Sequence, residues 1–205
     1  MHPSSSFRMP QDEALAFAAQ SGIGHLTTYV DGRIESVLIP FFVDDRQDPP
    51  TIYGHVSVLN PQTVSINDRA EALLIVDGPV SYVSPGLYPT KAETGRVVPT
   101  LSYLSVHVRG RLAPVTSTDD FRELLAVLTS RFETGRDEPW SIDDAPSDFI
   151  DAQMRAIQGF SLRVDDIQGV AKHSQNRPES DRVSVRTAFA DGTSEQVQIA
   201  GRMTS

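Results

Sequence analysis

The segment from Gly78 to Gly110 holds the largest group of residues that could bind or act on a ligand. A long irregular stretch lies between two strand-like patterns there, and among its prolines it carries Thr90, Lys91, Arg96 and Thr100. Such a stretch in a compact domain usually has a function, because its backbone polar groups need partners outside regular structure. Lysine and arginine form charge-assisted hydrogen bonds with phosphate, and threonine hydroxyls add neutral ones. The composition favours a site for an anionic, planar ligand over a solvated loop.

A second polar group is the run KHSQNR, residues 172–177. Lys172 and Arg177 supply cations, while Ser174, Gln175 and Asn176 supply neutral hydrogen-bonding groups. Amide side chains can bond both the donor and the acceptor edges of a planar heterocycle. From these residues alone a plain surface loop is an equal alternative, since polar runs commonly connect regular elements.

A third candidate combines His55 with Asn60 and Pro61. His55 stands near the end of an expected strand, and a helix beginning at Pro61 would direct free N–H groups towards an anion. Taken alone, the residues favour a simpler interpretation, in which Asn60 caps the helix and His55 is a surface histidine.

Other kinds of site find no support. The five histidines show no metal-ligand spacing, and Ser84 lacks the GxSxG context of a hydrolase nucleophile. The chain has no cysteine, which excludes disulfides, thiolate metal sites and cysteine nucleophiles. Neither a GxGxxG nor a P-loop pattern occurs, so a bound nucleotide would not occupy a Rossmann site.

Length and charge limit the classes of partner. A chain of 205 residues can bury one sizeable core with a small appendage. The net charge of −9 makes direct DNA binding unlikely, because neutralising phosphates requires clustered lysine and arginine. No apolar run approaches a membrane span and no signal-peptide core begins the chain, so no membrane association and a cytoplasmic location are expected.

Periodicity predicts the elements that would position these groups. The expected helices are residues 10–19, 61–67, 119–133 and 147–157, with Ser147 as the cap of the last. The expected strands are residues 23–30, 33–43, 51–56, 71–76, 80–83, 103–112 and 159–164, with a two-residue hairpin turn at Asp31-Gly32. Residues 183–203 fit either a hairpin or helices. Strands in hairpins with helices added late favour an antiparallel barrel over a βαβ fold.

Several strings together resemble a known family. GPVSYVSP, YPTKAETGRVVPT, SVHVRG, GHVSVLNP and KHSQNR occur in the order found in PaiB-type FMN-binding proteins, which are often described as negative transcriptional regulators. The N-terminal residues also fit, so the resemblance spans nearly the whole chain. Several separated motifs in the right order are more specific than any one of them.

The resemblance implies a fold, a cofactor and a site. The fold would be mainly β (α+β), an FMN-binding split β-barrel with peripheral helices that dimerises and holds FMN near the dimer interface. Residues 1–170 would form the barrel domain with its inserted helices, and residues 171–205 a C-terminal segment with a site loop and a helical tail. The implied cofactor-binding residues are His55, Asn60, Thr90, Lys91, Arg96, Thr100, Tyr103, Lys172, Ser174, Gln175, Asn176 and Arg177.

The chain departs from the family pattern at three aromatic positions. Thr63, Leu87 and Leu101 stand where the family commonly has tryptophan. A second interpretation is therefore a divergent member that lacks FMN and holds haem or another planar ligand, with His25, His55, His107 or His173 as available haem ligands.

Two functions remain open under the resemblance. One is a flavin-dependent oxidoreductase that uses nicotinamide or a small oxidant as its partner; no residue is an obvious catalytic acid, base or nucleophile. The other is a non-enzymatic regulator of transcription. No helix-turn-helix pattern appears, so such a regulator would act through a partner protein or an effector.

Overall fold

The computed structural model describes residues 4–203, which form two compact units. Unit 1 comprises the chain up to Ala14, Asp77–Val106 and the chain from Gln168 onwards. Unit 2 comprises Leu15–Val76 and His107–Ile167. The predicted boundary at residue 170 falls inside unit 1.

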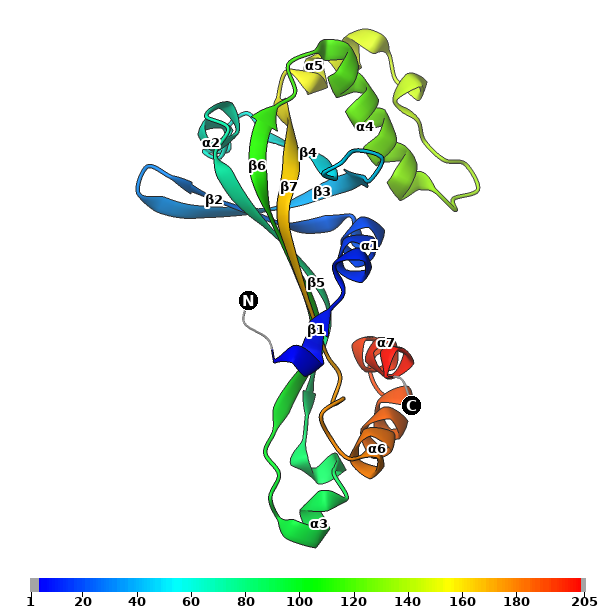
Figure 1. Cartoon of the computed structure of the whole chain (residues 1–205). Coiled ribbons are helices and arrows are strands. Elements are labelled where there is room, and N and C mark those ends of the chain that lie inside the picture. The colour runs from blue at the N-terminus through cyan, green and yellow to red at the C-terminus, as the bar shows by residue number, and fades with distance from the viewer. Residues whose placement is uncertain (1–3, 204–205) are drawn as a thin grey trace. The chain divides into compact units, whose positions relative to one another are not determined.

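Antiparallel strands form the framework (Figure 1). The order β7-β4-β3-β2-β5-β6, with a further pairing between β6 and β7, closes six strands into a barrel. Their bounds are β2 Ile23–Val30, β3 Arg33–Asp44, β4 Thr51–Ser57, β5 Glu71–Val83, β6 Thr100–Pro114 and β7 Ile157–Lys172. Strands β5, β6 and β7 contribute residues to both units.

Alternation along the strands builds the core of unit 2. Leu26, Ile39, Phe41, Phe160 and Leu162 turn inward and are almost fully buried. The predicted turn at Asp31-Gly32 is confirmed: both residues have positive φ, 48° and 81°, as a tight hairpin requires, and Val30 pairs with Arg33.

Two helices of unit 2 cover a second cluster of buried hydrophobic side chains. They are α4 Thr118–Glu133 and α5 Ser147–Met154, and they bury Phe121, Leu124, Leu128, Ile142, Ile150 and Met154 together. Ser117 caps α4 by accepting a hydrogen bond from the Asp120 N–H at 3.2 Å. The short α2, Thr63–Asn67, completes this unit.

Unit 1 gathers the ends of three strands with short helices. The strand β1, Arg8–Met9, pairs antiparallel with β7 at Val170 and Gly169. Helix α6, Glu179–Ala190, and helix α7, Ser194–Arg202, bury Val185, Phe189 and Ile199 against Val83 and Tyr88. Helix α3 spans Thr90–Thr94, and α1, Gln11–Ser21, has residues in both units.

The tail of the chain is helical, so the helical alternative of the sequence analysis is confirmed and the hairpin is wrong. Thr193 and Gln196 form a reciprocal capping box: the Thr193 hydroxyl accepts from the Gln196 backbone N–H, and the Gln196 side-chain oxygen Oε1 accepts from the Thr193 backbone N–H at 3.0 Å. This local pattern fixes the start of α7 and outweighs the alternating apolar residues around it.

Other predicted boundaries need correction. The break expected at Gly78-Pro79 is absent, because proline keeps a φ that an extended strand accepts, and β5 continues through it. The last strand reaches Lys172 rather than ending at residue 164. The irregular stretch contains the 3-10 turn Pro85–Leu87 and α3, and the helix cap predicted at Ser147 lies at Pro146.

Candidate functional site

A cavity of about 360 Å³ in unit 1 brings together six of the twelve predicted site residues. This volume lies within the range of small-molecule pockets, about 300–1,000 Å³. The lining consists of Phe7, Tyr88, Arg96, Val98, Pro99, Thr100, Lys172, Ser174, Asn176 and Arg177.

Two strand ends position the centre of this cavity. Thr100 begins β6 and Lys172 ends β7, and the Lys172 Nζ donates to the Thr100 hydroxyl at 2.6 Å. The Ser102 hydroxyl donates to the Lys172 carbonyl at 3.0 Å and fixes the two ends further. The Lys172 ammonium also lies 5.6 Å from the centre of the Phe7 ring. Its charge is therefore held beside the cavity by contacts on several sides.

The polar run after β7 folds back as a turn. Ser174 adopts a left-handed conformation, with φ of 63°, and its carbonyl accepts from the Arg177 N–H at 2.9 Å. Pro178 follows and α6 begins at Glu179, because proline suits the start of a helix and not its interior. The turn places Ser174, Asn176 and Arg177 together on the cavity wall.

Tyr88 anchors the opposite side and was not among the predicted site residues. The central carbon of the Arg177 guanidinium lies 4.4 Å from the centre of its ring, a cation–π contact. Tyr88 is 2% exposed, and its hydroxyl is buried with no partner among the described residues. Its place in the YPTK string, one residue before a proline, was the available signal.

Charge distinguishes the cavity from the rest of the chain. Its lining contains three cations, Arg96, Lys172 and Arg177, and no carboxylate or imidazole among its ten residues. The whole chain carries a net charge of −9. A cationic cavity on an acidic protein favours an anionic ligand and repels cations.

Four predicted residues of unit 1 do not line the cavity. The Thr90 N–H donates to the Asp181 carboxylate at 3.1 Å, and Lys91 is exposed on α3. The Gln175 side chain forms a hydrogen bond within its own turn, because its carbonyl oxygen accepts from the His173 N–H at 2.6 Å. Tyr103 is half-buried on β6.

His55 and Asn60 belong to unit 2. His55 lies on β4; burial lowers its pKa, and its Nδ1 is buried with no partner among residues 4–203. The helix predicted to begin at Pro61 begins at Thr63 instead. The Gln62 N–H donates to the Asn60 side chain at 2.9 Å, and the Thr63 N–H donates to the Asn60 carbonyl at 3.1 Å, so both donors are used within the turn.

His173 borders the cavity from the protein interior. Its Nδ1 lies 3.0 Å from the Ser102 hydroxyl, and the ring is buried. Burial lowers the pKa of His173 first, and the charge of Arg202 lowers it further. The imidazole is therefore neutral near pH 7 and adds no charge to the neighbouring Lys172 and Ser174.

The three positions without the family aromatics stand outside the cavity lining. The Thr63 hydroxyl donates to the Asn60 carbonyl at 2.9 Å. Leu87 is half-buried against the core of unit 1, and Leu101 is exposed on β6. Their replacement leaves the cation-lined wall intact.

Comparisons with known proteins identify the family of the chain. A family profile described as "Putative FMN-binding domain" matches residues 1–166. The chain is 29% identical, over 85% of its length and 81% of the relative's, to a Bacillus subtilis protein named "Protease synthase and sporulation protein PAI 2". The resemblance to PaiB-type proteins is thereby confirmed.

Solved structures support the fold. A conserved hypothetical protein from Mycobacterium tuberculosis, Rv2991, matches with a TM-score of 0.62 at 14% identity, over 87% of this chain and 95% of its own. A FAD and haem binding protein from Mycobacterium smegmatis matches with a TM-score of 0.58 at 14% identity, over 85% of this chain and 77% of its own. The predicted split β-barrel with peripheral helices is confirmed. Among the described residues no helix has the length and apolar character needed to cross a bilayer.

Proposed function

The chain belongs to the FMN-binding domain family, whose cofactor is FMN, and from this premise we propose that the cavity of unit 1 binds the phosphate-bearing end of FMN. The observation that carries the proposal is the lining itself, which has three cations and no carboxylate. A phosphate monoester is a strong acceptor with close to two negative charges at neutral pH, which such a wall would stabilise.

The residues present fit the phosphate group. Arg177 is oriented by its stacking on Tyr88, so its N–H groups could bond phosphate oxygens without first being ordered. Lys172 adds a charge already fixed by Thr100, and Ser174 and Asn176 add neutral donors. The six other predicted residues, His55, Asn60, Thr90, Lys91, Tyr103 and Gln175, remain predictions for the same cofactor.

We further propose that the loaded protein has redox activity. Bound FMN supplies the capacity for hydride and single-electron transfer, with nicotinamide or a small oxidant as the partner. The chain's own contribution would be to bind and orient the cofactor, because no carboxylate or imidazole lines the described cavity to move a proton. This division of roles agrees with the absence of an obvious catalytic acid or base in the sequence.

A comparison of FMN with riboflavin tests the phosphate assignment. Riboflavin has the same ring system but no phosphate, so FMN should bind at least about tenfold more tightly, a difference of about 1.4 kcal/mol. Fluorescence quenching of each flavin during titration with the protein gives both dissociation constants. Equal affinities for the two flavins would overturn the assignment.

The outer face of the β2–β3 hairpin supports a homodimer. Tyr29 and Ile34 are directly paired across the two strands and are 68% and 75% exposed, and Leu38 on the same face is 58% exposed. Large apolar side chains gathered on one strand face are typical of a surface that another protein covers. A second copy of this chain is the occupant proposed here, and light scattering of the purified protein would measure its mass in solution.

Regulation without catalysis is a second candidate function. It is favoured by the lack of acid–base groups in the cavity, and the Bacillus subtilis relative is named a protease synthase and sporulation protein. The net charge makes direct DNA contact unlikely, so FMN would act as an effector and a partner protein would make the contact. A gel-shift titration at moderate salt tests this: salt-sensitive, sequence-selective binding by the chain alone would contradict it.

The haem alternative is less favoured by the geometry. None of the ten cavity residues is a histidine or methionine, so haem iron would find neither of these ligands within the described lining. A Soret band after haem addition and desalting would restore this alternative.

A further inference from the structure

A second cavity, of about 580 Å³, lies within unit 2. It is formed between the loop that joins β3 to β4 and the first turns of α4. Its volume is well within the range of small-molecule pockets, about 300–1,000 Å³. Its lining includes none of the residues assigned to FMN, so it requires a separate explanation.

The inner part of this cavity is apolar and aromatic. Phe42 and Tyr53 are stacked, with ring centres 5.2 Å apart and an angle of 19° between the planes. Both rings pack against the buried cluster that includes Phe121 and Leu124, and Val127 of α4 adds an exposed aliphatic group. Such a surface favours a ligand with an aromatic or aliphatic body.

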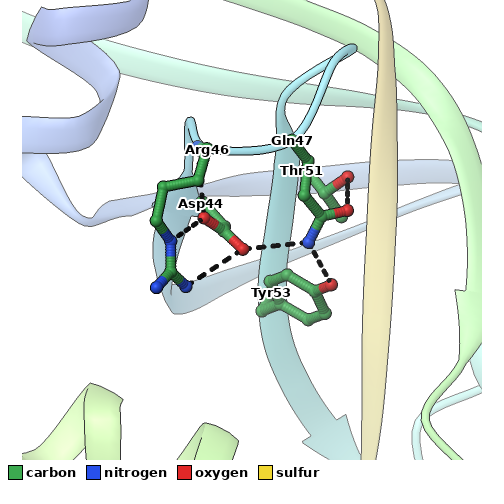
Figure 2. Close-up of polar contacts among 5 residues, drawn as sticks. All are labelled: Asp44, Arg46, Gln47, Thr51 and Tyr53. Atoms are coloured by element: carbon green, nitrogen blue, oxygen red, sulfur yellow. Dashed lines mark hydrogen bonds and ion pairs between the residues drawn. The ribbon is translucent and has the colours of Figure 1, made fainter.

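A hydrogen-bond network fixes the side of the cavity formed by the β3–β4 loop (Figure 2). Asp44 accepts from the Arg46 Nε at 2.8 Å and from the Gln47 Nε2 at 2.9 Å. The Gln47 Nε2 also donates to the Tyr53 hydroxyl at 3.0 Å, and the Gln47 Oε1 accepts from the Thr51 hydroxyl at 3.1 Å. The ring of Tyr53 is therefore held in place before any ligand binds.

The rim of the cavity is negatively charged. Arg46 is the single cation of the lining and is bound to Asp44, which raises the pKa of Arg46. Asp45, Asp120 and Glu123 also line the cavity, and none of them has a carboxylate oxygen within 4.0 Å of a described cationic nitrogen. Asp45 and Glu123 add a longer-range attraction to the charge of Arg46. The lining thus has three more carboxylates than cations beside its aromatic pair. Its net charge is negative, whereas that of the unit 1 cavity is positive.

We infer that this second cavity is a binding site for a small organic cation, namely an amine or guanidinium attached to an aromatic or aliphatic body. The apolar body would lie against the Phe42–Tyr53 pair, and the cation would face Asp120 and Glu123 at the rim. Charge complementarity selects the cation, and the aromatic floor selects its apolar attachment. The site is independent of FMN, which is anionic and would be repelled here.

A matched set of ligands tests the inference. The probe is 2-phenylethylamine, which is cationic at neutral pH, and the controls are 2-phenylethanol and phenylacetate, which have the same ring with no charge and with a negative charge. Calorimetry or NMR titration of the FMN-loaded protein should show saturable binding of the amine, at least about fivefold tighter than that of the alcohol. The affinity should fall as salt is added, because the rim carboxylates are exposed.

Charge-removing variants locate the site. The double variant Asp120→Asn with Glu123→Gln should weaken amine binding by about five- to tenfold, since each exposed ion pair contributes up to about fivefold. The control is Asp119→Asn, which removes one negative charge from the same helix at a residue outside the cavity lining and should leave binding unchanged.

Any of three results would overturn the cation site. The first is equal binding of the amine and the alcohol, and the second is an equal effect of the double variant and Asp119→Asn. The third is no saturation up to about 10 mM amine, which means a binding free energy weaker than about 3 kcal/mol. FMN binding is read in the same samples from flavin fluorescence. Absence of amine binding by the unchanged chain, with FMN binding intact, would refute the cation site and leave the proposed cofactor site standing.

Discussion

Replacement of Arg177 is the sharpest test of how unit 1 recognises an anion. Its guanidinium is stacked on Tyr88 at 4.4 Å and lines the cavity, so Arg177→Ala would remove both a cation and a preoriented set of donors. A hydrogen bond to a charged group contributes about 1.5–3 kcal/mol. FMN affinity should therefore fall by about 10- to 150-fold, while riboflavin affinity should change much less.

A conservative variant separates charge from geometry. Arg177→Lys keeps the positive charge and loses the planar stacking, which contributes about 0.5–1 kcal/mol, so the loss should be only about two- to fivefold. Arg136→Ala is the matched control, because it removes an exposed arginine of unit 2 that is paired with Glu133. Flavin fluorescence titration gives the constants, and circular dichroism verifies folding. If folded Arg177→Ala bound FMN within twofold of the unchanged chain, the cavity would not be the phosphate site.

Three further predictions concern stability, pH and assembly. Asp181→Ala should lower the free energy of unfolding by about 1–3 kcal/mol in urea titrations, because it removes the buried acceptor of the Thr90 N–H. Asp181→Asn keeps an acceptor oxygen and should lower it less. Equal losses in the two variants would contradict this role of Asp181. Burial holds the pKa of His173 below 6.5, so the unfolded chain binds this proton more readily than the folded one, and its contribution to stability should be full above pH 6.5 and fall as the pH drops below it. Thermal unfolding of His173→Gln should show a weaker fall in stability at low pH. An unchanged fall in this variant would contradict the prediction. Ile34→Asp with Leu38→Asp should convert the proposed dimer to a monomer in light scattering, and a dimer that persists would place the interface elsewhere.

Local patterns predicted much of the fold. The tight turn at Asp31-Gly32 and the apolar spacing of Phe121, Leu124 and Leu128 on α4 depend on neighbouring residues only, and both appear in the structure. Element lengths were harder to predict, because β5 passes through Gly78-Pro79 by pairing with neighbours that are distant in sequence. Such tertiary contacts override local preference.

The sequence predicted only part of the site, because the cavity also depends on contacts between residues that are distant in sequence. The charged and hydroxyl residues at 96–100 and 172–177 were recognisable by type, and the cavity joins them. Their meeting depends on β6 beginning where β7 ends, which brings Thr100 to Lys172 across 72 residues of sequence. Tyr88 was missed although it belongs to the YPTK string, because its burial depends on contacts with residues of α6 and α7 that are distant in sequence. The acidic cavity of unit 2 was missed because its walls come from separate segments, residues 42–53 and 114–127.

An absorbance spectrum of the purified protein, recorded after incubation with FMN and desalting, tests the central claim most directly. Family membership and the cation-lined cavity predict that the two visible flavin bands remain with the protein, and that Arg177→Ala loses most of them. Complete loss of both bands from the unchanged chain at tens of micromolar protein would contradict FMN binding, since a useful cofactor site should hold FMN with about 8 kcal/mol or more.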